Sequence, residues 1–194
     1  MPQINTNGVT LEYESYGDPA NPAMLLIMGL GAQLTLWPIE LVEALVARGY
    51  HVIRYDNRDI GLSTKFTQHG VPNVRKVVLM RLFGLRPKLP YRLTDMADDA
   101  VGLLDGLGID KAHIVGASMG GMIAQLVAAT YPDRTRSLTS IMSTTGNRRV
   151  PPAKPEAFKA LTTPPPANAT LDQMIPHVTR IARAIGSPAY PAPE

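Results

Sequence analysis

The stretch Gly116-Ala117-Ser118-Met119-Gly120 decides the fold of this 194-residue chain. It follows the apolar run 112–115, typical of a buried strand, and precedes the apolar run 122–129, typical of a helix. A serine on such a turn adopts strained backbone angles, so the residues two before and two after it must be small, as both glycines are. The pattern predicts that Ser118 presents its hydroxyl at a helix N-terminus, the nucleophile elbow arrangement. The alternative is a purely structural glycine turn, because the pentapeptide alone also occurs in ordinary turns.

The composition is that of an ordinary globular domain, with 45% hydrophobic and 18% charged residues. Lys and Arg number 19 against 16 Asp and Glu, a net charge of +3 that is too small to indicate a nucleic-acid partner. The chain has no cysteine, which excludes disulfides, thiolate metal sites and a cysteine nucleophile. We therefore expect neither a metal site nor a cofactor.

The N-terminal residues carry no targeting signal that we can recognise. Residues 1–8 lack the basic segment and apolar core of a secretory signal. The longest apolar stretch, 23–32, is too short to span a bilayer and is interrupted by glycine. The sequence predicts a non-secreted, cytoplasmic protein.

The first third of the chain alternates between strand-like and helix-like runs. Residues 9–16 alternate apolar and polar side chains and end in a turn, which predicts an antiparallel strand at one end of a sheet. The short apolar runs 24–28 and 51–55 are separated by a helix-length segment, 39–48. This alternation predicts βαβ units and a parallel sheet.

A second helix and a further strand flank the central turn. The helix is expected to open at Thr94, with acidic residues near its positive end, and to stop at Gly108. Its apolar residues keep helical spacing. The further strand is expected over 138–142.

The composition changes after Gly146. Six prolines between positions 151 and 166 predict a loop or an excursion that leaves the core. A capping box at 170–173 then opens a helix that Pro176 is expected to kink and Gly186 to end. One stripe of that helix is apolar: Leu171, Met174, Ile175, Val178, Ile181, Ala182 and Ile185.

Three motifs in order give the chain a resemblance to the α/β-hydrolase family, and in particular to its bacterial esterase and lipase members. They are the glycine-containing segment 26–31, the segment 54–63 and the serine turn within 113–121. The resemblance implies an α/β-hydrolase fold, with a mostly parallel sheet flanked by helices.

The segment Met28-Gly29-Leu30-Gly31 matches the family's His-Gly-X-Gly loop, with Met28 in place of the histidine. The resemblance assigns the backbone amides of Leu30 and Met119 to an oxyanion hole, and such donors do not depend on side-chain identity. The alternative is that Gly29 and Gly31 merely turn the chain after a strand.

Asp56-Asn57-Arg58 resembles a structural signature of the same family. Polar side chains directly after a strand commonly bond nearby loop backbone. We expect Asp56 and Arg58 to brace loops and to take no part in chemistry.

A serine nucleophile needs a base and an orienting carboxylate, which the family presents in the order Ser, Asp/Glu, His. Downstream of Ser118 the sequence holds one histidine, His177, and four acids, Asp133, Glu156, Asp172 and Glu194. His177 flanks the apolar stripe of a predicted helix, so it is a weak base candidate, and a surface or packed histidine is the default interpretation.

The resemblance also implies a division of the chain. Residues 1–147 match the N-terminal part of the hydrolase core, and residues 148–194 match the start of the cap or lid region. The C-terminal strands of the fold, and the loop that carries its histidine, are missing from these residues. The strand at 138–142 is then an exposed edge, which predicts self-association, aggregation or a need for a complementary fragment.

The segment 74–88 combines five basic residues with many apolar ones and contains no acid. One interpretation is peripheral contact with anionic lipid. The plainer one is a helix that covers the active-site entrance, with its arginines solvated.

The expected function is a carboxylic-ester hydrolase of the esterase or lipase kind, acting on a small-molecule ester or lipid through an acyl-enzyme at Ser118. An oxyanion hole without its base leaves only feeble activity. A non-catalytic remnant that binds an acyl ligand or a partner is therefore the first alternative. The second is a cofactor-free haloperoxidase or perhydrolase, which uses the same serine with peroxide as acyl acceptor.

Overall fold

The computed structural model describes residues 2–70, 80, 85, 89–147, 149–151, 153–163, 169–187 and 189. The chain divides into two compact units, Met1–Thr145 and Gly146–Glu194. Apart from Met80 and Leu85, the basic segment 74–88 lies outside the described residues, so its helix and its lipid contact stay predictions.

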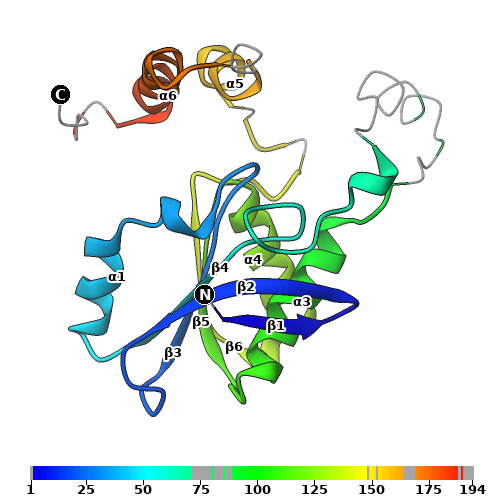
Figure 1. Ribbon diagram of the computed structural model, residues 1–194, viewed down its shortest axis with the longest axis vertical. Helices are drawn as coiled ribbons and strands as arrows, with labels where there is room; N and C mark the ends of the chain where they lie inside the picture. The colour runs from blue at the N-terminus through cyan, green and yellow to red at the C-terminus, as the bar shows by residue number, and fades with distance from the viewer. Residues whose placement is uncertain are drawn as a thin grey trace. The chain divides into compact units, whose positions relative to one another are not determined.

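A six-stranded sheet forms the centre of the first unit (Figure 1). Its strands are β1 (Gln3–Thr6), β2 (Val9–Tyr16), β3 (Ala23–Ile27), β4 (His51–Tyr55), β5 (Ala112–Ala117) and β6 (Thr135–Ile141). The spatial order is β1-β2-β4-β3-β5-β6. Strand β2 runs antiparallel to β1 and β4, whereas β4, β3, β5 and β6 pair in parallel. The mostly parallel sheet of the expected fold is confirmed.

One expectation about the sheet edge is wrong. The strand predicted over 9–16 is antiparallel, but β1 lies outside it and occupies the edge. Asn7 and Gly8 connect the two strands and adopt positive φ angles of 45° and 75°. Asn-Gly is the dipeptide that a tight hairpin turn favours, so the sequence did contain this signal.

Helices cover both faces of the sheet. Helix α1 (Ile39–Val46) packs Val42 against one face, in a cluster with Leu26 and Val52. Helices α3 (Leu93–Gly106) and α4 (Met119–Thr130) cover the other face, where they bury the opposite side chains of the same strands. Burial on two faces explains why the central strands are apolar at almost every position.

The boundaries of several elements differ slightly from the predicted ones. Helix α3 begins at Leu93 rather than Thr94, α4 includes Met119 directly after the serine, and β6 begins at Thr135. The described part of the unit also contains three single 3₁₀ turns: η1 (Leu34–Leu36), η2 (Thr67–His69) and η3 (Pro132–Arg134).

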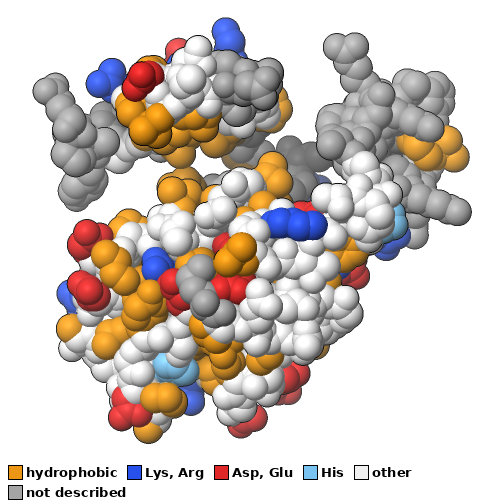
Figure 2. Space-filling model, viewed as in Figure 1, with side chains coloured by type: hydrophobic (Ala, Val, Ile, Leu, Met, Phe, Trp, Pro, Cys, Tyr) orange, Lys and Arg blue, Asp and Glu red, His pale blue; other side chains and the backbone are white. Residues whose placement is uncertain are grey.

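The second unit contains helices α5 (Pro155–Thr162) and α6 (Leu171–Ile185). The capping box of α6 is present, since the Thr170 N–H donates to Gln173 Oε1 at 3.1 Å, and the helix runs through Pro176. Helix α5 corrects the expectation of a loop. Pro155 occupies its first turn, where a helix needs no N–H donor. Figure 2 shows hydrophobic side chains gathered along one side of this helix pair.

The assignment of residues 148–194 to a cap stays a prediction. In the described part of the chain, no helix combines the length and the apolar character needed to cross a membrane.

Strand β6 lies at the end of the sheet opposite β1, and the expected exposed edge is present. All its residues after Thr135 are exposed, including Leu138 at 42%. An unpaired edge with apolar side chains is a template for pairing with another chain.

We predict that this edge makes the 194-residue chain self-associate. Size-exclusion chromatography should show a species larger than the 21.0 kDa monomer. Thr139→Lys should shift the population to monomer, because a charge on an edge strand opposes pairing. Thr67→Lys adds the same charge at an exposed site in η2 and should leave the elution unchanged. A wild-type chain that stays monomeric at high concentration would contradict the prediction.

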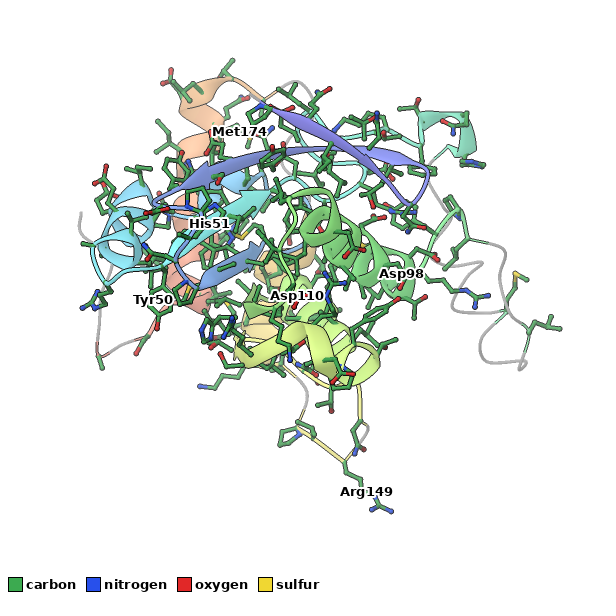
Figure 3. All side chains as sticks on the ribbon, turned by 90° about the horizontal axis from the view of Figure 1, so that it is seen from below. Tyr50, His51, Asp98, Asp110, Arg149 and Met174 are labelled. Carbon is green, nitrogen blue, oxygen red and sulfur yellow. The ribbon has the colours of Figure 1, made fainter. Side chains whose placement is uncertain are left out.

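His51, labelled in Figure 3, is the first residue of β4. It lies at the other end of the strand from the loop that follows Tyr55. It is 5% exposed, and its Nε2 lies 2.6 Å from the Ser15 Oγ. Burial lowers the pKa of the imidazole below its ordinary value of 6.5, and Asp18 offsets part of that shift. The folded protein therefore favours the neutral ring.

This shift predicts a loss of stability in mild acid. Below pH 6.5 the unfolded chain takes up a proton at His51 before the folded protein does, so the free energy of unfolding falls until the pH passes the lowered pKa. In urea titrations at a series of pH values, His51→Gln should flatten this decline. His69→Gln, at an exposed position, should keep the wild-type slope, and an equal slope in all three proteins would refute the assignment.

Candidate active site

Ser118 lies between the end of β5 and the start of α4, with φ 55° and ψ −120°. This left-handed conformation costs a non-glycine residue about 1–3 kcal/mol and persists only where the surroundings hold it. The end of β6 supplies two of the contacts that hold it. The Ser118 N–H donates to the Ile141 carbonyl at 3.0 Å, and the Ser143 hydroxyl donates to the Ser118 carbonyl at 2.7 Å.

The positions predicted to be small around the serine must be glycine, because other backbone segments lie too close for a Cβ atom. A Cβ on Gly116 would overlap the carbonyl group of Gly120, and a Cβ on Gly120 would overlap the carbonyl oxygen of Ile27. A Cβ on Gly29 would lie 3.6 Å from the Ser118 Oγ. Glycine at this position therefore keeps space open beside the hydroxyl.

Of the two backbone amides singled out from the sequence, Met119 follows Ser118 directly, and Leu30 follows Gly29, where an added Cβ would lie 3.1 Å from the Ser118 Cβ. In the described part of the chain, the N–H groups of Leu30 and Met119 donate no hydrogen bond. Leu30 is 80% exposed, and Gly31 beside it has a φ of +71°, which favours glycine. Met119 is the first residue of α4, where the helix leaves its N–H groups free.

Asp56 and Asn57 hold the loop that carries Leu30. The Asn57 amide donates to the Met28 carbonyl at 2.9 Å, and Asp56 Oδ1 accepts from the Leu34 N–H at 2.7 Å. Asp56 Oδ2 also accepts from the Leu62 N–H at 3.1 Å. The bracing contacts expected of Asp56 are present, and both side chains are buried.

Arg58 makes a buried ion pair with Asp99 of α3. Its Nε lies 2.7 Å from Oδ2 and its Nη2 lies 2.6 Å from Oδ1, a two-pronged geometry. Asn7, in the β1–β2 turn, donates to the same Oδ1 at 2.9 Å. The pair therefore joins the hairpin, the loop after β4 and α3, as expected of a bracing residue.

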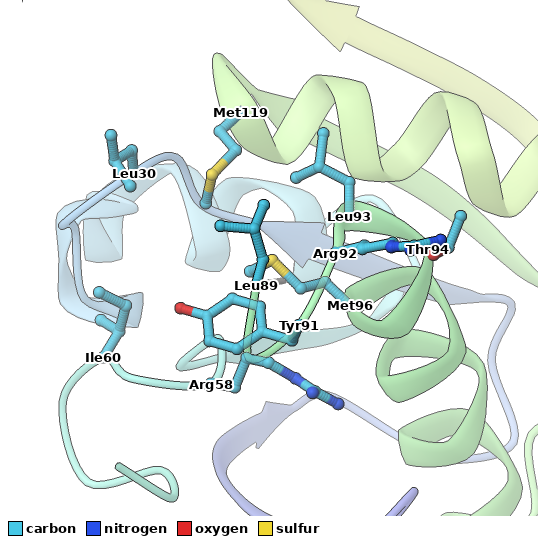
Figure 4. A pocket seen from close by; sticks show the side chains of 10 residues that line it. All are labelled: Leu30, Arg58, Ile60, Leu89, Tyr91, Arg92, Leu93, Thr94, Met96 and Met119. Carbon is cyan, nitrogen blue, oxygen red and sulfur yellow. The ribbon is translucent and has the colours of Figure 1, made fainter. Parts of the chain in front are cut away.

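A cavity of about 740 Å³ opens next to the Leu30 and Met119 side chains (Figure 4). Its lining is Leu30, Arg58, Ile60, Leu89, Tyr91, Arg92, Leu93, Thr94, Met96 and Met119. The walls are mainly apolar and lie at the carboxyl ends of the parallel strands, where sites form in this class of sheet.

Tyr91 forms part of the cavity wall and is held from several sides. The Arg58 Cζ lies 5.2 Å from its ring centroid, and the Phe66 ring centroid lies 5.3 Å away. Burial, and a hydrogen bond with Asp59, raise the pKa of the Tyr91 hydroxyl to about 12. The hydroxyl is therefore neutral at physiological pH.

The described histidines of the first unit do not bond Ser118. His51 and His113 lie near the starts of their strands, His69 is in η2, and none of them bonds the serine hydroxyl. His177 belongs to the second unit, where its Nδ1 lies 3.1 Å from the Arg180 Nη2. A catalytic histidine needs a carboxylate at its second ring nitrogen, but the neighbour of His177 is the cation Arg180. Within the described ranges, no three acidic or histidine side chains cluster to form a metal site.

Sequence reasoning missed two residues of this site, Ser143 and Tyr91, and the contact made by a third, Asn57. Ser143 carries no motif, although it follows the carboxyl end of β6, where sites form. Tyr91 lies just before α3 and reaches the cavity only through tertiary packing. Asn57 was noted as part of a signature, but its bond to the loop before Leu30 depends on the neighbouring strand.

Comparison with known proteins identifies the family of the chain. Residues 22–176 match the family described as alpha/beta hydrolase fold, and the chain belongs to that family. A rhodomycin D methylesterase of Streptomyces peucetius is 39% identical over 72% of this chain and 41% of its own length. A 3-oxoadipate enol-lactonase of Acinetobacter baylyi is 30% identical over 68% of this chain and 40% of its own length.

Solved structures show the same similarity. The enol-lactonase of Burkholderia xenovorans LB400 has a TM-score of 0.61 and 27% identity, over 94% of this chain and 65% of that one. An epoxide hydrolase of Mycobacterium thermoresistibile has a TM-score of 0.55 and 28% identity, over 71% of this chain and 37% of that one. The chain spans about two fifths of the length of the curated relatives it matches.

The Arg58–Asp99 pair leads to a stability prediction. Arg58→Met should lower the free energy of unfolding by about 3–5 kcal/mol, because it leaves a buried carboxylate without its cation. The double variant Arg58→Met/Asp99→Leu should recover most of that loss, since it removes both charges. Urea unfolding measures both effects. A double variant no more stable than the single one would show that the pair is not the cause.

Proposed function

We propose that the chain carries the nucleophile and the oxyanion-binding amides of a serine hydrolase that cleaves carboxylic esters. The observation that carries the proposal is Ser118 in its left-handed conformation, partly exposed and followed directly by Met119, whose N–H donates no hydrogen bond. The Leu30 N–H also donates none, and it follows Gly29, which approaches Ser118 closely. A turn of this kind places a serine hydroxyl above the sheet at a helix N-terminus, the geometry of a nucleophile elbow.

In the proposed reaction the Ser118 oxygen attacks the acyl carbon of the ester, and its proton passes to a base. The two amides stabilise the negative charge on the carbonyl oxygen in the tetrahedral intermediate. The alcohol then leaves with a proton, and an acyl-serine remains. Water attacks the acyl-serine, releases the carboxylic acid and restores the hydroxyl.

The relatives and the cavity support an ester of a small molecule as the substrate. Two of the relatives are named as a methylesterase and an enol-lactonase, and both names describe cleavage of an acyl–oxygen bond. The cavity beside Leu30 and Met119 is large enough for a drug-sized molecule. The lipase alternative and its lipid contact depend on segment 74–88.

The proton acceptor for Ser118 separates the hydrolase from a second candidate, a non-catalytic binding protein. In the described part of the first unit, no histidine or carboxylate bonds the Ser118 hydroxyl. This observation supports the second candidate, a chain that binds an acyl ligand without turning it over. The perhydrolase alternative shares the acyl-serine and replaces water with peroxide in the last step.

A fluorophosphonate probe distinguishes an activated serine from a binding remnant. We predict labelling of the 194-residue chain at Ser118, located by peptide mass spectrometry and lost in Ser118→Ala. Removal of the base slows a serine triad by about a millionfold in the best-studied protease, so labelling within minutes would require a base in this chain.

Ser15→Ala is the matched control. The Ser15 Oγ lies 2.6 Å from the His51 Nε2, but Ser15 is within strand β2 rather than on a strand-to-helix turn. This variant should label like the wild type. A chain that resists the probe over hours would reject the catalytic proposal for these residues and support the binding remnant.

A further inference from the structure

The cavity lined by Leu30 and Met119 presents an aromatic ring that is already fixed in place. The Tyr91 ring packs against the Arg58 guanidinium and the Phe66 ring, and its hydroxyl bonds Asp59. Asp59 itself accepts from the Phe66 N–H at 2.6 Å, which ties the two aromatic residues to one loop. A ring held from several sides loses little freedom when a ligand packs on it, so it is a preorganised surface.

Two of the polar groups in the cavity wall are engaged by aspartates. The Arg58 guanidinium is committed to both oxygens of Asp99, so its charge is neutralised within the wall. In Figure 4 the Arg92 side chain extends toward Thr94, away from the Tyr91 hydroxyl. The Tyr91 hydroxyl is occupied by Asp59. A ligand in this space therefore meets mainly apolar groups and the ring.

Two thioethers accompany the ring. Met96 and Met119 line the same cavity, and Figure 4 shows Leu89 and Met96 in the immediate surroundings of Tyr91. Sulfur atoms near a ring edge and offset ring pairs each favour an aromatic ligand over a saturated one of equal size.

We propose that this cavity binds an aromatic arm of the ester and that Tyr91 is the residue that selects it, by ring stacking. The inference rests on the proposed function for the nature of the ligand as an ester. The binding preference itself needs no reaction at Ser118, so the two can be tested separately.

The test compares two uncharged probes of similar size, methyl 2-naphthoate and methyl decahydronaphthalene-2-carboxylate. Their dissociation constants are measured by ligand-observed NMR on the full chain with Ser118→Ala, which prevents hydrolysis. The aromatic probe should bind roughly threefold to tenfold more tightly, the range that an aromatic pair adds beyond buried area. Tyr91→Leu in the same background should remove this preference, and Tyr91→Phe, which keeps the ring, should retain it.

Tyr131→Leu is the matched control, because Tyr131 also bonds an aspartate, Asp98 at 2.7 Å, but lies outside the cavity. It should keep the preference. Thermal melts by circular dichroism show which variants are folded, and Tyr91→Phe provides the second readout if Tyr91→Leu is not. Equal affinity for the two probes, no binding of either, or an unchanged preference in folded Tyr91→Leu would each overturn the inference.

The outcomes separate this inference from the proposed function. Fluorophosphonate labelling of Ser118 without an aromatic preference would overturn the role of Tyr91 and leave the hydrolase proposal standing. A preference that depends on Tyr91 in a chain that resists the probe would support the role of Tyr91 and overturn the catalytic proposal.

Discussion

The strained turn at Ser118 is the constraint on which the rest of the structure depends. A serine adopts a positive φ there because β5 must end and α4 must begin within one residue. The cost is offset by hydrogen bonds from the end of β6 and by glycines that let three backbone segments approach closely. Consequently the geometry around the hydroxyl depends on β3, β5 and β6 together. Any change that moves one of these strands changes the site.

A second constraint links the site to the rest of the first unit. The buried Arg58–Asp99 pair connects the β1–β2 turn, the loop after β4 and helix α3. The same guanidinium packs on the Tyr91 ring in the cavity wall. Both oxygens of Asp99 accept hydrogen bonds from it. A buried pair of this kind adds little net stability but penalises every arrangement that breaks it. The cavity wall therefore includes an arginine whose charge is paired within the protein.

The sequence interpretation was accurate for features set by residues close together in the chain and failed for contacts between distant residues. The motif around Ser118 predicted its strand and helix correctly, because glycine spacing and apolar runs act within a few residues. The outer strand β1 was missed, although Asn7-Gly8 marked its hairpin, and α5 was expected as a loop because its prolines were weighed without their position. Ser143 and Tyr91 could not be found in this way, since each reaches the site from a distant part of the chain.

The sequence by itself determined the fold class and the serine turn with its glycines. These features follow from local backbone geometry, which residue type controls directly. Tertiary structure alone decided that Arg58 is neutralised by Asp99 and that Tyr91 lines the cavity. Such contacts join residues many positions apart, so they exist only once the strands have taken their order in the sheet.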